Sequence, residues 1–196
     1  MNGIRTCELL WMAFLVVWIV WAIRTKATKV RESVASRLSY SVPTIAAYYL
    51  MFSERARVDA LGQPLFRSSP WLDPLGVAIT VAGLGVAVWA RAFIGLNWSS
   101  TVTVKVEHQL ITSGPYRWVR HPIYSGMILA LLGTALARNQ PRGLLAVVFL
   151  YVGFKIKSRA EERFMTNAFG AEYERYRRNT GAILPRVRAS KAFGRG

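Results

Sequence analysis

The sequence is poor in the residues that build metal and disulfide sites. Its 196 residues include one cysteine, Cys7, and two histidines, His108 and His121. A single cysteine excludes an internal disulfide and a cysteine-based zinc site, and two histidines are too few for a histidine-rich metal centre. We therefore expect no metal ion in the functional site.

Acidic residues are also scarce, because ten Asp and Glu stand against 26 Lys and Arg, and the formal net charge is +16. Nucleic-acid binding would explain this charge, but it would not explain a hydrophobic content of 53%. A membrane protein with basic flanks accounts for both properties. We therefore expect membrane lipids, and no nucleic acid, among the partners of the chain.

Long uncharged runs are missing too, since no run reaches the ~20 residues that usually span a bilayer. Five shorter apolar runs are present, and flanking Lys and Arg side chains can extend toward the interface at their ends. The first run has no small-residue cleavage site before Arg24, so we interpret it as a retained anchor. The sequence predicts one all-α integral membrane domain, residues 1–196, with about five transmembrane helices at 8–24, 37–54, 73–93, 121–138 and 142–160.

The basic residues predict how these spans are oriented. With the N-terminus outside, twenty of the 26 Lys and Arg lie on the cytoplasmic side and six lie outside. This bias is typical of multi-pass membrane proteins. It places the C-terminal region in the cytoplasm, where the fifth helix is expected to continue past Arg159 and to stop at Phe169-Gly170, before a second short helix over Ala171–Asn179.

Two further patterns predict local structure. The third run contains Gly76, Gly83 and Gly85 among alanines, which favours close packing against a neighbouring helix; close approach of a ligand to bare backbone is the alternative. The segment 101–106 alternates polar and apolar residues, as a short strand does.

The stretch 114–126 lies between a polar segment and an apolar run, and it contains Pro122. Proline is well tolerated in the first turn of a helix, so we place His121 near the N-cap and Pro122 at the first helical position. The free N–H groups of such a helix start favour anions. Arg120 and His121 add donors there, and Tyr124 shares the helix face of His121.

Glu161 and Glu162 are adjacent acids in a chain that has few. By spacing they could pair along their own helix with Lys157, Arg159 or Arg163. Alternatively, they face the stretch 114–126 as anions opposite a cationic site. Such a pocket suits a zwitterion that is also cationic, because its ammonium would meet a glutamate and its carboxylate an arginine or helix N–H groups.

The stretch 114–126 resembles the Arg-His-Pro-x-Tyr-x-Gly signature of the isoprenylcysteine carboxyl methyltransferase family, whose general pattern the phospholipid methyltransferases share. Residues 108–114 resemble the family's lead-in to this signature. Glu161-Glu162, Phe169-Gly170 and Leu184-Pro185-Arg186 resemble its C-terminal block. The resemblance covers about residues 95–186, which we take as the catalytic part, and it is specific because several spaced elements agree in order.

The resemblance implies S-adenosylmethionine as cofactor and methyl donor. It agrees with the lack of Gly-x-Gly-x-x-Gly after a strand, the fingerprint of the soluble nucleotide-binding fold. Arg120 and Glu162 are then expected to be catalytic. The expected cofactor-binding residues are His108, Tyr116, Arg120, His121, Pro122, Tyr124, Gly126, Glu161 and Glu162. The expected substrate-binding residues are Asn97, Trp98, Arg120 and Tyr176.

The expected activity is carboxyl O-methylation of a prenylcysteine-like lipophilic acceptor. A carboxylate is already ionised at pH 7 and needs alignment and desolvation rather than a general base. N-methylation of a phospholipid or amine and S-methylation of a small thiol are alternatives, and for an amine Glu161 or Glu162 could be the base. A non-enzymatic membrane scaffold and an anion transporter are the other classes. We expect a bacterial inner-membrane protein whose active site faces the cytoplasm.

Overall fold

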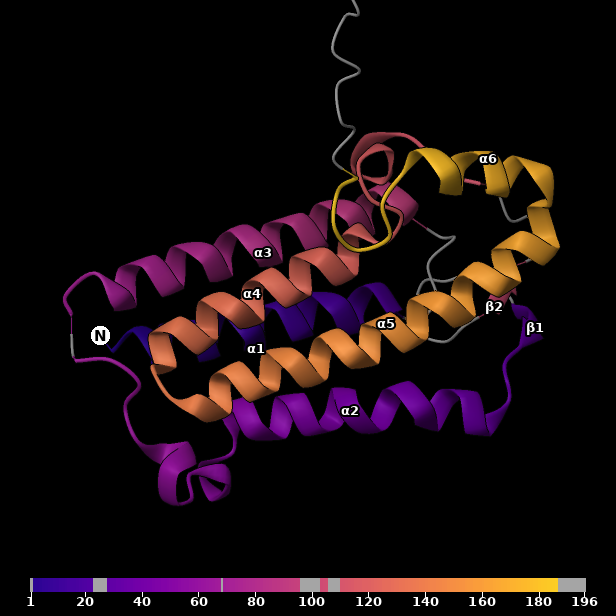
Figure 1. Cartoon of the computed structure of the whole chain (residues 1–196). Helices are drawn as coiled ribbons and strands as arrows, with labels where there is room; N and C mark the ends of the chain where they lie inside the picture. The colour runs from indigo at the N-terminus through magenta and orange to yellow at the C-terminus, as the bar shows by residue number, and fades with distance from the viewer. Residues whose placement is uncertain (1, 23–27, 68, 96–102, 106–109, 187–196) are drawn as a thin grey trace, which may run out of the picture.

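The computed structural model describes residues 2–22, 28–67, 69–95, 103–105 and 110–186. Five long helices run along a common axis in this part of the chain, and a short sixth helix lies at one end of the bundle (Figure 1). The six helices are α1 (Gly3–Ala22), α2 (Val34–Phe52), α3 (Leu72–Ile94), α4 (Pro122–Arg138), α5 (Pro141–Phe169) and α6 (Ala171–Asn179). Short 3-10 turns are η1 (Glu54–Ala56), η2 (Asp59–Gly62) and η4 (Gly114–Arg117).

A two-stranded ribbon is the exception to the all-α expectation. The strand predicted over 101–106 is confirmed as β2 (Thr103–Lys105). It pairs antiparallel with β1 (Thr28–Arg31), for which the sequence analysis named no strand. The ribbon lies at the same end of the bundle as α6 (Figure 1), and it links the segments that precede α2 and follow α3.

Helices α3 and α4 pack closely because glycines face each other across their contact. A Cβ added at Gly83 would lie 2.3 Å from the backbone nitrogen of Ala130, and one added at Gly126 would lie 2.6 Å from the carbonyl oxygen of Gly83. Gly76 meets Gly133 in the same way. Small residues allow this approach of two backbones in a membrane. The packing interpretation is therefore confirmed for Gly76 and Gly83, whereas Gly85 faces open space.

Apolar side chains cover much of the outside of the bundle. Leu15, Val16 and Ile19 on α1 are more than half exposed, as are Val42 and Ile45 on α2. By length and composition α1 and α3 could each cross a membrane, and α4 is apolar but shorter. A bundle that presents apolar side chains outward in this way suits a lipid environment rather than water.

Candidate active site

The start of α4 follows the expected geometry. His121 occupies the N-cap position and Pro122 opens the helix, although the imidazole makes no capping hydrogen bond. The segment before it is held by the C-terminal part of the chain, because the backbone N–H groups of Arg120 and His121 donate to the carbonyls of Gly181 and Ala182 at 2.8 and 3.0 Å. This pairing fixes where the side chains of Arg120 and His121 point.

Two adjacent carboxylates of α5 meet this helix start. Glu162 Oε1 accepts hydrogen bonds from Arg120 Nε at 3.0 Å and from Nη2 at 2.8 Å, and His121 Nε2 lies 3.2 Å from the same oxygen. His121 Nδ1 lies 3.3 Å from Glu161 Oε2. The imidazole therefore sits between the two carboxylates, and a ring protonated on both nitrogens satisfies both of them.

The geometry thus favours the arrangement in which the glutamates face the stretch 114–126, rather than basic residues of their own helix. Anions are favourable at a helix N-terminus, and here α5 supplies them. Burial opposes ionisation of Glu162, but hydrogen bonds from His121 and Arg120 outweigh it and lower its pKa to about 2. Burial also opposes ionisation of Glu161, but His121 and the nearby Lys157 lower the pKa of this carboxyl as well. Both groups are thus carboxylates at neutral pH.

Tyr124 completes the cluster on the side of Glu161. Its hydroxyl donates to Glu161 Oε1 at 2.6 Å. Its ring stacks on His121 with the ring centroids 5.3 Å apart, and on Phe154 of α5 with the centroids 4.5 Å apart. The rings fix the orientation of the imidazole, as the expected shared face of His121 and Tyr124 implies.

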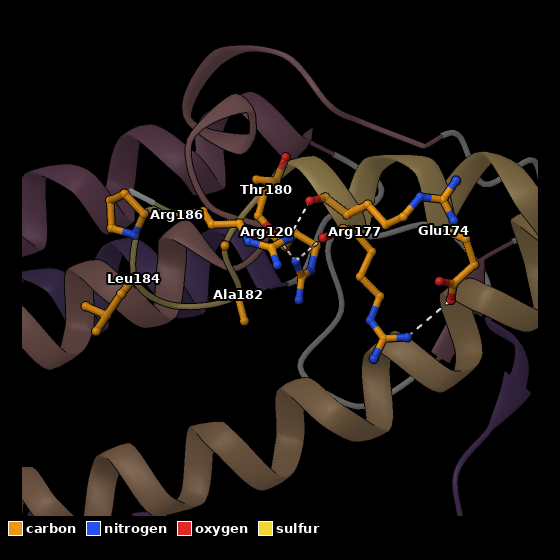
Figure 2. A pocket seen from close by; sticks show the side chains of 10 residues that line it. Arg120, Glu174, Arg177, Thr180, Ala182, Leu184 and Arg186 are labelled. Carbon is orange, nitrogen blue, oxygen red and sulfur yellow. Dashed lines mark hydrogen bonds and ion pairs between the residues drawn. The ribbon is translucent and has the colours of Figure 1, made fainter. Parts of the chain in front are cut away.

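An open pocket of about 590 Å³ lies on the side of Glu162. Figure 2 shows Arg120 between Leu184, Ala182 and Arg186 on one side and Arg177 and Glu174 on the other. Nη1 of Arg120 donates to the backbone carbonyls of Thr180 and Arg177. The pocket is lined by Arg120, Glu174, Arg177, Arg178, Thr180, Gly181, Ala182, Leu184, Pro185 and Arg186. Four arginines against one glutamate make this lining strongly cationic.

Several residues that the sequence predicts to bind the cofactor or the substrate make contacts with other parts of the protein. The side chain of Tyr116 is buried, and its hydroxyl donates to the carbonyl of Ala90 on α3 at 3.3 Å. The hydroxyl of Tyr176 donates to the backbone carbonyl of Tyr116 at 2.5 Å, so this side chain joins α6 to η4. Gly126 lies in the contact between α3 and α4, and Pro122 is buried at the start of α4. Asn97, Trp98 and His108 lie outside the described residues.

Arg177 is a site residue that sequence reasoning missed. Its Nε lies 3.6 Å from Glu162 Oε2, and its Nη1 lies 3.2 Å from Glu174 Oε1. The sequence shows a basic run at Arg175, Arg177 and Arg178, but the run does not say which of them faces the glutamates. Only the position of α6, set by the turn at Gly170 with φ 52°, brings Arg177 to the pocket.

The fold and the site together define a class of protein: a helical membrane bundle with a charged pocket at one end. A solved structure described as the eukaryotic intramembrane Ras methyltransferase ICMT has the same kind of fold, with a TM-score of 0.55 and 24% identity. The match covers 74% of this chain and 52% of that one. At this level of identity the likeness shows the fold alone.

Sequence comparisons define the family. The phospholipid methyltransferase family model matches residues 73–172, and the chain belongs to this family of membrane methyltransferases. The protein-S-isoprenylcysteine O-methyltransferase of Saccharomyces cerevisiae is 32% identical over 57% of this chain and 48% of its own length. The cobalt-zinc-cadmium resistance protein CzcN of Cupriavidus metallidurans is 32% identical over 60% of this chain and 52% of its own length.

The human protein-S-isoprenylcysteine O-methyltransferase is 27% identical over 79% of this chain and 54% of its own length. The chain therefore spans about half the length of these curated relatives. The family membership and the apolar helices together make it an integral membrane protein, distantly homologous to the isoprenylcysteine carboxyl methyltransferases.

Proposed function

We propose that this protein transfers a methyl group from S-adenosylmethionine to the carboxylate of a prenylcysteine-like lipophilic acceptor. The observation that carries the proposal is the cluster of Arg120, His121, Glu161 and Glu162 beside the open pocket. The membership of the chain in a family of membrane methyltransferases supports the same reading. Because the matches cover only about half the length of each curated relative, the acceptor is inferred from the chemistry of the site.

The pocket residues fit this cofactor. A volume of about 590 Å³ falls in the range of about 300–1,000 Å³ for small-molecule sites. Arg178 and Arg186 are exposed, and a guanidinium group can bind a carboxylate through two parallel hydrogen bonds, in the bidentate mode. The carboxylate of Glu174, which lines the pocket, suits an ammonium group, and the carboxylate of Glu162 lies behind the lining residues Arg120 and Arg177. Leu184, whose side chain is 72% exposed, and Pro185 give an apolar wall for a flat base.

The residues of the cluster then have separate roles. Arg120, which lines the pocket, holds the Glu162 carboxylate beside it through two hydrogen bonds, so the position of this carboxylate is fixed. His121 and Tyr124 hold Glu161 on the other side of the imidazole. When bound, S-adenosylmethionine supplies a methyl group on a positively charged sulfur. The two carboxylates favour this charge.

The protonation of the glutamates favours an anionic acceptor. An amine acceptor must lose a proton, and a glutamate whose pKa is about 2 is a weak base at neutral pH. An ionised carboxylate needs no base. N-methylation of a phospholipid, which the name of the family model suggests, and S-methylation of a small thiol are therefore the rival activities. A scaffold without enzymatic activity would bind no cofactor.

We also propose that α1 to α4 and the part of α5 at about 142–160 span the membrane, with the rest of α5, the pocket and α6 on the cytoplasmic side of a bacterial inner membrane. The cluster and the pocket lie at the α6 end of the bundle (Figures 1 and 2), and the bias of basic residues supports a cytoplasmic position for this end. In this arrangement the cofactor comes from the cytoplasm and the lipophilic acceptor from the bilayer.

The experiment that tests the proposal uses purified protein in lipid nanodiscs. Calorimetry measures the binding of S-adenosylmethionine, and transfer of a labelled methyl group is followed with prenylcysteine, phosphatidylethanolamine and a small alkyl thiol as acceptors. We expect binding of the cofactor and base-labile label, typical of a methyl ester, on prenylcysteine. Label confined to the amine lipid or the thiol would contradict the proposed acceptor, and a lack of binding would contradict the proposed enzyme class.

A further inference from the structure

Two arginines contact the carboxylate of Glu162, and they are held in different ways. The side chain of Arg120 is 9% exposed and donates from two nitrogens to Oε1, at 3.0 and 2.8 Å. Its Nη1 also donates to the backbone carbonyls of Thr180 and Arg177. The side chain of Arg177 is 50% exposed, and its Nε lies 3.6 Å from Oε2, which is longer than a hydrogen bond. Because exposed ion pairs contribute little, Arg177 is the partner of Glu162 that a ligand can replace.

Arg177 also has a second carboxylate within reach. Its Nη1 lies 3.2 Å from Oε1 of Glu174, one turn earlier on α6, and Figure 2 shows these two groups side by side at the pocket. The hydroxyl of Thr166 on α5 donates to the same oxygen at 3.3 Å, which ties the Glu174 side chain to α5. The guanidinium group of Arg177 can therefore leave Glu162 and keep its contact with Glu174.

Glu162 keeps its negative charge without Arg177. Burial raises the pKa of this carboxyl, but hydrogen bonds from His121 and Arg120 outweigh burial, and both of these residues contact Oε1. Arg177 lines the pocket and lies against the other oxygen, Oε2. Its departure therefore opens a charged oxygen to a ligand in the pocket.

We propose that Arg177 is a positioning residue that competes with the positively charged sulfur of S-adenosylmethionine for Oε2 of Glu162. This inference rests on the proposed function and deepens it, because it states how the site distinguishes the methyl donor from the product. In methyl transfer the S–CH3 bond breaks and leaves its electron pair on sulfur, while a lone pair of the acceptor carboxylate forms the O–CH3 bond. The sulfur is then neutral and no longer competes, so Arg177 returns to Glu162.

This competition limits how tightly the donor is bound before the reaction. A carboxylate that held the positive sulfur without a competitor would stabilise a charge that the transition state is losing. Such stabilisation of the ground state slows the chemical step, and Arg177 offsets it. Loss of Arg177 should therefore lower the dissociation constant of the donor and kcat together, as expected for an interaction that acts on the ground state.

The test compares Arg177→Met and Arg177→Lys with Arg175→Met, in lipid nanodiscs. Arg175 is a matched control, because it is an exposed arginine of α6 that is not one of the residues lining the pocket. Calorimetry gives the dissociation constants of S-adenosylmethionine and of S-adenosylhomocysteine, the product that lacks the methyl group. Both ligands carry the same ammonium and carboxylate groups, so the ratio of the two constants reports the charge on sulfur.

We expect Arg177→Met to bind S-adenosylmethionine at least ~5-fold more tightly, which is the effect of an exposed ion pair. Binding of S-adenosylhomocysteine should stay within ~2-fold, and kcat at saturating donor should fall. Arg177→Lys keeps the positive charge and should lie closer to the unchanged protein, which Arg175→Met should resemble. Equal or weaker binding of S-adenosylmethionine by a folded Arg177→Met protein overturns the proposal.

Glu174→Gln provides a second test if Arg177→Met does not fold. This variant lacks the carboxylate that keeps Arg177 when it leaves Glu162, so the preference for S-adenosylmethionine over the product should fall. An unchanged preference in Glu174→Gln overturns the proposal. In each of these cases, binding of S-adenosylmethionine and methyl transfer by the unchanged protein would leave the proposed function standing. If the unchanged protein binds neither ligand, the proposed function and this inference fail together.

Discussion

Replacing Glu162 by glutamine removes one negative charge from the centre of the site and preserves the shape of the side chain. Glu162 Oε1 accepts from two nitrogens of Arg120 and faces one nitrogen of His121. Hydrogen bonds to charged groups contribute ~1.5–3 kcal/mol each. Arg120 keeps its hydrogen bonds to the carbonyls of Arg177 and Thr180 in the variant. We therefore expect the free energy of unfolding to fall by ~2 kcal/mol, near the lower end of this range.

The pKa of Glu162 gives a second measure of the same effect. A pKa lowered from 4.5 to about 2 corresponds to ~3 kcal/mol, at about 1.36 kcal/mol per pH unit. Solvent screening at this partly exposed site reduces this value to ~2 kcal/mol. For a chain of this size the melting temperature should fall by ~4–8 °C. A group whose pKa is lowered on folding stabilises the protein above pH 4.5, and this stabilisation is lost as the pH falls toward 2.

The assay is a thermal melt in detergent at several pH values between 2 and 7, with calorimetry of S-adenosylmethionine at pH 7. Glu162→Gln should melt lower than the unchanged protein at pH 7, and the difference should shrink below pH 4.5. The dissociation constant of the cofactor should rise at least ~10-fold, as loss of ~1.4 kcal/mol implies. The matched control is Glu172→Gln, because Glu172 is exposed on α6. If both variants melt and bind alike, the reasoning about the cluster is refuted.

The remaining predictions concern the arginine of the cluster, the helix contact and the orientation in the membrane. Arg120→Lys should lower the initial rate of methyl transfer at least ~10-fold at saturating cofactor. The reason is that a lysine cannot contact Glu162 and two carbonyls at once. A near-normal rate would show that Arg120 is only an anchor at the membrane interface. Gly83→Leu should prevent close packing of α3 on α4 and abolish a cooperative melt, whereas Gly85→Leu, which meets open space, should melt within a few degrees of the unchanged protein. Reporter fusions at the C-terminus should read out as cytoplasmic, and an external signal would overturn the proposed orientation.

Local signals in the sequence predicted much of the helical framework. Pro122 marked the start of α4 because proline fits the first helical turn. Gly170 marked the end of α5, since its positive φ suits glycine after a helix. The short helix predicted over Ala171–Asn179 is confirmed as α6, which has these bounds. These signals depend on a few neighbouring residues, which is why a single sequence carries them.

Contacts between distant segments were not accessible in the same way. Thr28–Arg31 has no alternating pattern, and it becomes a strand because β2 provides its partner. The spacing of Glu161 and Glu162 allowed pairing along α5 as well as pairing with the start of α4, and only the fold favours one arrangement. Tyr116 and Gly126 lie inside the motif, but the hydroxyl of Tyr116 and the backbone of Gly126 contact α3.

The hydrogen bonds that join Arg120 and His121 to residues 180–182 also set an order of events during synthesis. Arg120 and the carbonyl of Thr180 are 60 residues apart in sequence. At ~5–20 residues per second, a ribosome takes roughly 3–12 seconds to add that length. During this interval α4 can enter the membrane while Arg120 and His121 still lack Glu162 and the carbonyls of residues 180–182. The nascent chain therefore contains α4 before it contains the residues that hold Arg120 and His121, and the proposed site forms only after residues 180–182 have been made.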